Sequence, residues 1–412
     1  MAAEGGAKAR DALDALTKVC GDVRPGEPEE GVLGVVPGVV AAPATSAEAA
    51  EVMRTAAELG LAVVPRGAET RLDWGAPPAR CDVLVDTARL DQVVEHAAGD
   101  LVVTAEAGLD TGRLAEVLAE RGQRLALDAP LPGSTVGGTI ATAAAGPLRL
   151  LYGTPRDLVI GLTVIRADGR VARSGGKVVK NVAGYDLGRL FSGSYGTLGL
   201  IVEATFRLHP IPAAQAYITC DLTDATRAYE AVQAVLHSPA VPSAVEVVSS
   251  SQDGLTLGVL LEGVPEGVAA RTEQVSALLG AAGTQVRTAQ EPPEWWGAYP
   301  DGTTLIDVTA PPSALATLLE HRTEGVSLSW SAAGHGYLGL TPEADPAGTL
   351  ARVREDLGGR HNGAAVVRYT PEAVRNEIDL WGPVPAFSLM RRVKEQFDPE
   401  NRLSPGRFVG GL

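Results

Sequence analysis

Two short loops rich in glycine and proline constrain the fold of this chain more than any other feature. Residues 65–70 follow the apolar run at 61–64, and residues 132–139 follow the apolar run at 125–127. Glycine allows close backbone approach, and successive backbone N–H groups in such bends form concave anion sites. A fold that joins the two loops would therefore have an amide-lined cradle for a diphosphate. Taken singly, each loop is also consistent with an ordinary turn after a strand.

Local patterns predict several elements around these loops. Thr45 and Glu48 have the spacing of a capping box, which predicts a helix that begins there. A β-branched strand at 158–166 is followed by Asp168-Gly169, a hairpin signal, and by a returning strand at 170–173. The small residues at 139–145 predict a further helix, so that Gly137 and Gly138 would lie at its N-terminus, where the helix dipole favours an anion.

The length and the pattern along the chain predict two domains. A chain of 412 residues is too long for one ordinary core. Beyond Pro212, strands at 216–221, 244–249 and 256–261 alternate with alanine-rich helices at 226–236 and 268–279. This alternation predicts a second domain in which helices pack on one face of a sheet.

The composition argues against nucleic acid and anionic lipid as partners, and it predicts a cytoplasmic protein. A net charge of −15 opposes binding to nucleic acid and to anionic lipid. The three cysteines (Cys20, Cys81 and Cys220) are far apart, so they predict no disulfide framework, no zinc site and no protein-held iron–sulfur cluster. The N-terminus lacks the apolar core of a signal peptide, and no apolar run reaches about 18 residues. We expect a cytoplasmic protein without direct membrane insertion, peripheral at the inner face of the membrane only through partners.

Common nucleotide-binding motifs are absent from the sequence. No GxGxxG follows a strand and opens a helix, and the glycines at 193–199 have the wrong spacing for it. Gly175-Gly176-Lys177 lacks the upstream glycine and the downstream hydroxyl residue of a phosphate-binding P-loop. These absences argue against a Rossmann dehydrogenase and against an ATPase.

A wider set of motifs resembles the FAD-binding domain of the vanillyl-alcohol-oxidase superfamily. The set is Pro-Arg-Gly-x-x-Thr at 65–70, Pro-Gly-Ser-Thr-Val-Gly-Gly-Thr at 132–139, Tyr-Gly-Thr-Pro-Arg-Asp at 152–157, Lys-Asn-Val-Ala-Gly-Tyr-Asp-Leu at 180–187 and Gly-Ser-Tyr-Gly-Thr-Leu-Gly at 193–199. The block at 180–187 is similar to the glycolate oxidase D and E flavin subunits in particular, and the overall pattern is closest to the smaller E subunit. Residues 397–399 and 403–407 resemble the C-terminal segment of the same family.

The resemblance implies an α+β fold in four parts. A lead-in at 1–36 would precede a two-subdomain FAD-binding domain of the p-cresol methylhydroxylase (PCMH) type at 37–212. A smaller α/β-sandwich cap, or substrate domain, would cover 213–385, and the C-terminal segment at 386–412 would return to the FAD domain. Covalent members of the family often carry His in or just after the first loop, where this chain has Ala68, Glu69, Thr70 and Arg71. The FAD is therefore expected to be non-covalent.

The resemblance also implies which residues hold the FAD. The diphosphate would lie between two loops, the flavin would pass the small residues after the second loop, and the adenine end would meet the start of a strand by backbone contacts. The first loop is Pro65, Arg66, Gly67, Ala68, Glu69 and Thr70, and the second is Pro132, Gly133, Ser134, Thr135, Val136, Gly137, Gly138 and Thr139. The remaining contacts are Ala143, Ala144 and Ala145 for the flavin and Gly199, Leu200, Ile201 and Val202 for the adenine. The family's usual Asn before the final Pro-Gly is Ser404 here, which weakens any role for that side chain.

The implied chemistry is oxidation of a small 2-hydroxy acid, glycolate to glyoxylate, and the candidate catalytic residues are His335, Arg368 and Lys177. Such a substrate needs a cation for its carboxylate and a base for its hydroxyl proton. His335 lies in Ala-Gly-His-Gly, only a faint echo of the metal motif of the larger flavin subunit, and no metal site is expected. A lone His is more often a structural or surface residue, and Lys177 and Arg368 are of a type that more often carries a solvated surface charge.

The resemblance further implies a heteromeric complex with a second FAD subunit and an iron–sulfur subunit, because this chain has no cysteine cluster to relay electrons. Two alternatives stay open. The chain could be a non-catalytic or electron-relay flavoprotein that supports a larger catalytic flavin subunit. It could also be a free-standing oxidase of another alcohol.

Overall fold

The computed structural model describes residues 2–128, 131–176, 187–249, 254–282 and 285–412. These residues form two compact units. The first unit comprises residues 1–144, 154–210 and 385–412, and the second comprises residues 145–153 and 211–384. The division differs from the expected domains at two places. The lead-in belongs to the first unit, and residues 145–153 belong to the second.

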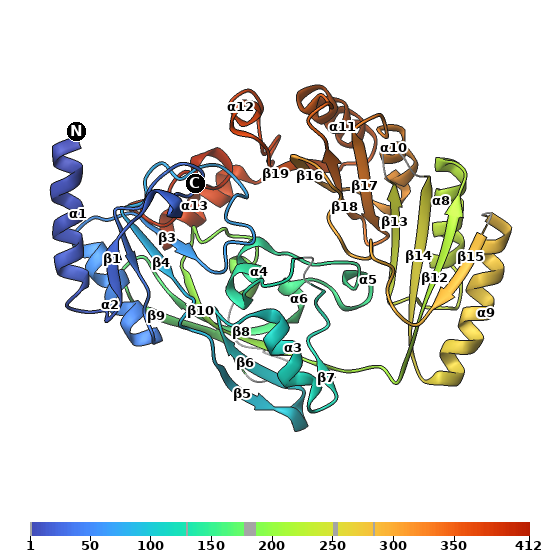
Figure 1. Ribbon diagram of the computed structural model, residues 1–412, viewed down its shortest axis with the longest axis horizontal. Helices are drawn as coiled ribbons and strands as arrows, with labels where there is room; N and C mark the ends of the chain where they lie inside the picture. Colours follow the sequence, from blue (N-terminus) through green and yellow to red (C-terminus); the bar gives the residue numbers. More distant parts are fainter. Residues whose placement is uncertain (1, 129–130, 177–186, 250–253, 283–284) are drawn as a thin grey trace. The chain divides into compact units, whose positions relative to one another are not determined.

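The first sheet of the first unit is a small, mostly parallel sheet. Its strands run in the order β1 (Val23–Pro25), β2 (Val39–Ala41), β4 (Val83–Asp86) and β3 (Val63–Arg66), and only β1 is antiparallel to its neighbour. Helices α1 (Ala2–Leu16) and α2 (Ser46–Glu58) lie beside it (Figure 1). Leu16 of α1 and Met53 of α2 are fully buried in one core. The N-terminal residues therefore contribute to this core, because β1 pairs with β2 and α1 packs on α2.

Helix α2 begins where the capping pattern predicts. The Thr45 hydroxyl accepts a hydrogen bond from the Glu48 amide at 3.1 Å. The Glu48 carboxylate reaches back to the Ala44 amide at 2.8 Å, one residue before the expected position. The helix crosses from β2 to β3, so the first loop leaves the carboxyl end of a parallel strand, the usual position of ligand sites in such sheets.

The second sheet of the first unit is antiparallel and has five strands. The order is β5 (Val93–Ala97), β6 (Val102–Glu106), β10 (Leu200–Arg207), β8 (Val159–Ile165) and β9 (Val171–Gly175). The hairpin predicted at Asp168-Gly169 joins β8 to β9, and the Arg166 amide donates to the Arg170 carbonyl across it. The other elements of this region are α3 (Thr111–Ala119), β7 (Gln123–Arg124), α4 (Val136–Thr142), α6 (Pro155–Leu158), α7 (Leu187–Phe191) and β11 (His209–Pro210).

Helix α4 covers different residues from those predicted. The sequence predicts a helix at 139–145, whereas α4 begins at Val136 with Thr135 as its N-cap and ends at Thr142. Ala143 stops it by adopting a left-handed conformation with a φ of 53°. The hydroxyl of Thr135 caps the helix by accepting from the Gly138 amide at 3.2 Å, so the start is set by a side chain rather than by the first apolar residue.

The C-terminal segment returns to the first unit, as the resemblance predicts. After helix α13 (Phe387–Phe397), the chain runs parallel to β3. The Val63 amide donates to the Arg402 carbonyl, and the Ser404 amide donates to the Val63 carbonyl, both at 2.8 Å. The segment therefore holds the strand that ends in the first glycine loop.

The second unit is an eight-stranded antiparallel sheet with helices on one side (Figure 1). The strand order is β15 (Gln285–Ala289), β12 (Ala214–Leu222), β14 (Leu255–Gly263), β13 (Ala244–Ser249), β17 (Val326–Ser331), β18 (His335–Leu340), β16 (Thr304–Thr309) and β19 (Ala364–Tyr369). The helices on that side are α8 (Ala225–Leu236), α9 (Pro265–Ala282), α10 (Leu315–Glu320) and α11 (Pro346–Arg360). Shorter helices are α5 (Arg149–Tyr152) and α12 (Glu372–Arg375).

The two faces of this large sheet differ in chemistry. Residues such as Ile218, Leu257 and Leu338 are fully buried and alternate along their strands with polar residues. Cross-strand partners in an antiparallel sheet share a face. The register aligns Asp307 with Tyr337 and Tyr337 with Ser329, so these polar groups share the face opposite the apolar residues. Buried polar residues on this face are Glu246, Asp307, Ser329 and Ser331.

Candidate functional site

The first unit contains an open pocket at the carboxyl end of β3. Three stretches that are distant in the sequence line it, namely the loop after β3, the N-terminal part of α4, and the approach to β10 with its first residues. The principal lining residues are Pro65, Arg66, Gly67, Ala68, Glu69, Thr70, Thr135, Gly137, Gly138, Gly199, Leu200 and Ile201.

The two glycine loops are in direct contact at this pocket. The hydroxyls of Thr70 and Ser134 lie 3.3 Å apart, and the Arg71 guanidinium donates to the Ser134 hydroxyl at 3.0 Å. Gly67 packs against Thr135 so closely that a Cβ at residue 67 would overlap the Thr135 hydroxyl. The juxtaposition expected from the two loops is therefore present.

The loops differ in the hydrogen bonds that their amides already make. The Gly137 amide donates to the Ala107 carbonyl at 2.7 Å, and the Gly138 amide donates to the Thr135 hydroxyl. In contrast, none of the four amides at 67–70 donates to an acceptor in the described part of the chain. The first loop thus offers four consecutive N–H groups to a ligand, whereas the amides at the start of α4 serve the fold. Gly137 and Gly138 lie in the first turn of α4, so the prediction that they lie near a helix N-terminus agrees with the structure.

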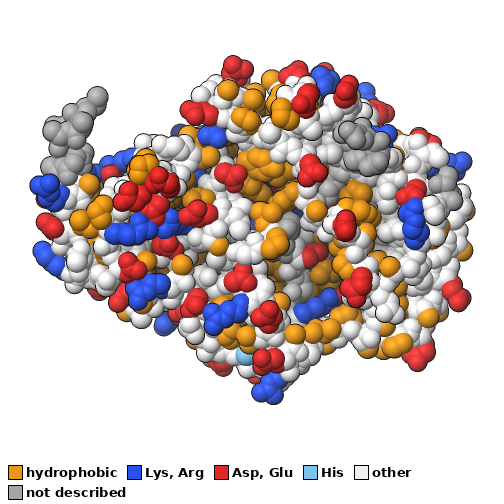
Figure 2. Space-filling model, in the orientation of Figure 1, with side chains coloured by type: hydrophobic (Ala, Val, Ile, Leu, Met, Phe, Trp, Pro, Cys, Tyr) orange, Lys and Arg blue, Asp and Glu red, His pale blue; other side chains and the backbone are white. Residues whose placement is uncertain are grey.

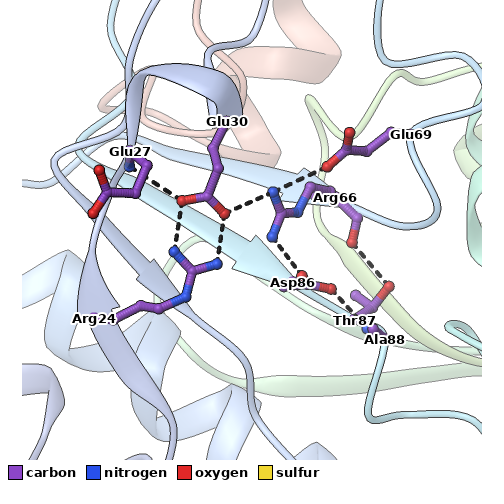
Figure 3. Close-up of polar contacts among 8 residues, drawn as sticks. All are labelled: Arg24, Glu27, Glu30, Arg66, Glu69, Asp86, Thr87 and Ala88. Carbon is purple, nitrogen blue, oxygen red and sulfur yellow. Dashed lines mark hydrogen bonds and ion pairs between the residues drawn. The ribbon is translucent and has the colours of Figure 1, made fainter.

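The side chain of Arg66, one of the predicted FAD-binding residues, forms ion pairs within the protein. Its guanidinium contacts Asp86 at 2.6 Å, Glu69 at 3.0 Å and Glu30 at 3.1 Å (Figure 3). Glu30 also binds Arg24 through two hydrogen bonds of 2.6 Å. Figure 2 shows acidic and basic side chains gathered together over this part of the unit. Because carboxylates balance the guanidinium, Arg66 contributes to the pocket mainly through its backbone.

This carboxylate–guanidinium network predicts a pH-dependent stability. The hydrogen bonds from Arg24, together with those from the Glu27 amide and Arg66, lower the pKa of Glu30 to about 2. A lowered folded-state pKa stabilises the protein above the pKa of the unfolded state, and this stabilisation is lost as the pH falls towards the folded-state value. We expect Glu30→Gln to lower the free energy of unfolding by about 1–2 kcal/mol at pH 6, and the difference from wild type to shrink to nothing as the pH approaches 2.

Urea unfolding at a series of pH values measures this difference. Glu29→Gln is the matched control, because Glu29 is exposed and makes no ion pair with any residue that the structure describes. A difference between Glu30→Gln and wild type that stayed constant with pH would show that the network does not lower the Glu30 pKa.

The other predicted FAD residues lie around the pocket or beside it. Those that do not line it are Pro132, Gly133, Ser134, Val136, Thr139, Ala143, Ala144, Ala145 and Val202. Ser134 is fully buried beneath the first loop, and Ala145 belongs to the second unit. Lining residues that the sequence did not predict are Arg71, Leu72, Thr87, Ala107, Ala141, Thr142, Tyr195, Gly196 and Arg407. Tyr195, Gly196 and Arg407 lie in motifs that carried the resemblance, which is the one signal that could have found them.

The residues present fit an FAD diphosphate. The four available amides of the first loop are neutral donors, so they can stabilise an anion next to the paired charges of the Arg66 network. Gly67 leaves no room for a side chain between the two loops, which keeps these amides close to α4. A diphosphate bound there would receive its hydrogen bonds from the backbone of residues 67–70.

A second cluster of chemically active side chains lies on the polar face of the large sheet in the second unit. His335 lies with its Nε2 atom 3.1 Å from the Asp307 carboxylate. Arg368 donates to the same carboxylate from Nε at 3.0 Å and from Nη2 at 2.7 Å. The structure thus brings together two of the three predicted catalytic residues. The third, Lys177, lies outside the described residues.

Burial and charge oppose each other within this cluster. Burial raises the pKa of Asp307, but the charge of Arg368 and the contacts with His335 outweigh it, and the net pKa is lowered. Burial lowers the pKa of His335, Asp307 raises it, and the nearby guanidinium of Arg149 lowers it further, with a net lowering. At neutral pH the site therefore holds an ionised Asp307 beside a neutral His335.

The surroundings of this cluster are aromatic and cationic. The rings of His335 and Tyr337 meet edge to face at 4.9 Å, and Tyr299 meets Tyr337 in the same way at 4.7 Å. Arg149 donates to the Ala145 carbonyl at 2.7 Å, and its Nε has no partner within the described ranges. Arg149 carries a charge that no carboxylate balances among the described residues. No sequence pattern points to Arg149, because a single arginine in a short helix has no characteristic spacing.

Within the described residues, no helix is both long enough and apolar enough to cross a membrane. A search of the same residues finds no group of three His, Cys, Asp or Glu side chains placed to hold a metal ion.

Two family descriptions match the chain. Residues 37–175 match the FAD binding domain, and residues 381–408 match the C-terminal domain of FAD linked oxidases. The first match contains both glycine loops, and the second contains α13 and the segment that runs beside β3.

Known proteins resemble the chain over nearly its whole length. It is 28% identical to glycolate oxidase subunit GlcD of Bacillus subtilis, covering 90% of this chain and 89% of that protein. It is 28% identical to a D-lactate dehydrogenase of Archaeoglobus fulgidus, covering 91% and 92%. The solved structure of p-cresol methylhydroxylase with substrate bound aligns over 97% of this chain and 96% of that one, with a TM-score of 0.72 and 16% identity. This likeness confirms the predicted two-subdomain fold. The chain therefore contains an FAD binding domain and the C-terminal domain of FAD linked oxidases, and its cofactor is FAD.

Proposed function

We propose that the chain oxidises a small 2-hydroxy acid, such as glycolate, with FAD as the electron acceptor. The observation that carries this proposal is the pairing of a neutral His335 with an ionised Asp307 near cationic side chains. A neutral imidazole can accept a hydroxyl proton, and a guanidinium can bind a carboxylate. The two full-length relatives are named for glycolate and D-lactate, which are both 2-hydroxy acids, and this supports the same substrate class here.

In this proposal the first unit holds the cofactor. The amides of residues 67–70 bind the diphosphate, and Gly199, Leu200 and Ile201 meet the adenine end through their backbone. FAD is bound non-covalently, since the first loop contains neither His nor Cys. Bound FAD supplies a two-electron acceptor for the hydride that leaves the carbon bearing the hydroxyl.

The second unit supplies the groups for the substrate. His335 takes the hydroxyl proton, which leaves electrons free to expel the hydride from the adjacent carbon. Arg149 and Arg368 bind the carboxylate. Arg149 is better suited to bind it directly, because Arg368 already donates two hydrogen bonds to Asp307. Lys177 is a further proposed cation for the carboxylate.

The proposal includes a cytoplasmic heteromeric complex that contacts the membrane only through its partners. A second flavin subunit and an iron–sulfur subunit would remove the electrons, and the relative named as a subunit of glycolate oxidase supports an assembly of this kind. Cys20, Cys81 and Cys220 are buried, and they form no disulfide among the residues that the structure describes.

We expect glycolate or D-lactate to bleach the visible flavin absorption of the purified protein, or of the complex that copurifies with it, under anaerobic conditions. Acid precipitation should release yellow FAD into the supernatant, because the bond is non-covalent. Visible spectroscopy measures both results.

A matched substrate analogue sharpens this test. Glycolamide keeps the hydroxyl but lacks the carboxylate, so it should bleach the flavin far more slowly if Arg149 and Arg368 bind the carboxylate. A flavin that stays oxidised with every 2-hydroxy acid would overturn the substrate class. Bleaching that depends only on the partner's flavin would favour the electron-relay alternative, and rapid peroxide formation by the isolated chain would favour a free-standing oxidase.

A further inference from the structure

We propose that Asp307 is the positioning residue of the substrate site, and that it holds His335 with the proton on Nε2 so that Nδ1 is the atom that accepts the substrate's proton. The inference rests on the proposed function and names the reactive atom within it. It also assigns a role to a side chain that no sequence motif singled out.

The strand register places the two side chains together. Asp307 lies on β16 and His335 on β18, which are antiparallel neighbours, and the pairing sets Asp307 opposite Tyr337 and Thr309 opposite His335. Side chains two residue pairs apart lie on the same face as diagonal neighbours and are within reach of each other. The sheet itself, rather than a loop, therefore sets the distance of 3.1 Å between the carboxylate and Nε2.

The chemistry of the pair fixes the tautomer. An ionised carboxylate can only accept hydrogen bonds, so the ring nitrogen that contacts it must carry a proton. A neutral imidazole has one proton, and Nδ1 is then left with its lone pair. Among the described residues, Nδ1 of His335 has no hydrogen-bond partner. The atom that can act as a base is therefore the one that the protein leaves available.

Arg368 keeps the carboxylate in the required state. It contacts Asp307 through two nitrogens, so Asp307 stays ionised although its side chain is only 6% exposed. The titratable and charged groups around His335 are Asp307 on β16, Arg368 on β19, Tyr337 on β18, Arg149 on α5 and Tyr299. The cations disfavour an imidazolium, so a neutral His335 is available at neutral pH.

Nitrogen NMR tests the tautomer independently of any turnover. The full-length protein loaded with FAD is labelled with ¹⁵N histidine, and the signal of His335 among the six histidines is identified by its loss in His335→Gln. We expect the shifts of an imidazole protonated at Nε2, and we expect Asp307→Asn to give a mixture of tautomers, because an amide can both donate and accept. A His335 protonated at Nδ1 in the wild-type protein would overturn the inference.

Anaerobic flavin reduction by a 2-hydroxy acid tests the role in the reaction. We expect Asp307→Asn to lower the limiting rate by about a hundredfold with little change in FAD content. The wild-type rate should rise with pH as His335 loses its proton, and this rise should move to lower pH in Asp307→Asn, because the carboxylate raises the His335 pKa. Asp307→Glu should recover part of the rate. The double variant Asp307→Asn/His335→Gln should be no slower than His335→Gln alone, since both changes remove one function.

A second His–Asp pair in the same unit provides the matched control. His321 lies 3.2 Å from Asp356, between α10 and α11 on the helical side of the sheet. Asp356→Asn should leave the rate, its pH profile and the His335 signal unchanged. An Asp307→Asn protein that reduces its flavin at the wild-type rate with the wild-type pH profile would refute the positioning role. If no 2-hydroxy acid reduces the wild-type flavin, the proposed function fails, and the NMR result alone then decides whether Asp307 sets the tautomer.

Discussion

Gly67→Val is expected to abolish FAD retention, with a dissociation constant at least about a thousandfold higher than that of the wild-type protein. A side chain at residue 67 would overlap Thr135, so the first loop must move away from α4. Its four available amides would then lose their convergence on the diphosphate. Hydrogen bonds to charged groups contribute about 1.5–3 kcal/mol each. The loss of two of them weakens binding by about 4 kcal/mol, which corresponds to roughly a thousandfold.

FAD titration followed by flavin fluorescence measures the affinity. Gly99→Val is the matched control, because Gly99 belongs to the same unit and has open space around its Cα. A pair of compensating substitutions distinguishes a steric clash in the pocket from a general loss of folding. Gly67→Ala alone should weaken binding, and adding Thr135→Ala should recover much of it, because that change removes the overlapping hydroxyl. A Gly67→Val protein that is as yellow as wild type would show that the diphosphate binds elsewhere.

Lys394→Met is expected to be the most destabilising single change outside the pocket. Lys394 on α13 is 5% exposed, and its Nζ donates to Asp398 at 2.7 Å and to the carbonyls of Leu403 and Thr197 at 2.8 and 2.9 Å. Burial lowers the pKa of Lys394, and Asp398 offsets part of that effect. Removing the ammonium leaves a fully buried carboxylate unpaired, which costs about 3–5 kcal/mol.

Arg391→Met provides the control for this prediction. Arg391 and Glu395 lie on the same helix with the same i, i+4 spacing, but both side chains are 60% exposed, so the expected change is within about 0.5 kcal/mol. Urea unfolding followed by flavin fluorescence measures both variants in the unit that holds FAD. Lys394→Met/Asp398→Asn should recover part of the lost stability, because no buried charge is then left alone. A Lys394→Met midpoint equal to that of Arg391→Met would refute the structural role.

The sequence predicted the FAD-binding part of the fold well because its signals are local. The capping pattern at Thr45 and Glu48 and the turn at Asp168-Gly169 act within a few residues, and both appear where expected. The boundaries of α4 were wrong for the same reason. Its start depends on a hydrogen bond from the Gly138 amide to Thr135, and its end depends on the left-handed conformation of Ala143.

The predicted catalytic residues show which parts of the site can be predicted from local sequence and which cannot. His335 and Arg368 could be named from residue chemistry, whereas Asp307 could not, since it lies 28 residues from His335 in the sequence. Only the antiparallel pairing of β16 and β18 places its carboxylate on the same face of the sheet. Arg149 was not predicted as a site residue. The sequence assigns residues 145–153 to the FAD-binding domain, whereas in the structure they belong to the second unit.

The sequence by itself determines that two glycine loops occur, and that Arg391 and Glu395 have the same i, i+4 spacing as Lys394 and Asp398. It could not determine which loop keeps its amides available, or which ion pair is buried, because the spacing of the residues is the same in both cases. Tertiary packing decided both. The carbonyl of Ala107 binds the Gly137 amide, and the return of the chain beside β3 covers Lys394 and Asp398 but leaves Arg391 and Glu395 in solvent.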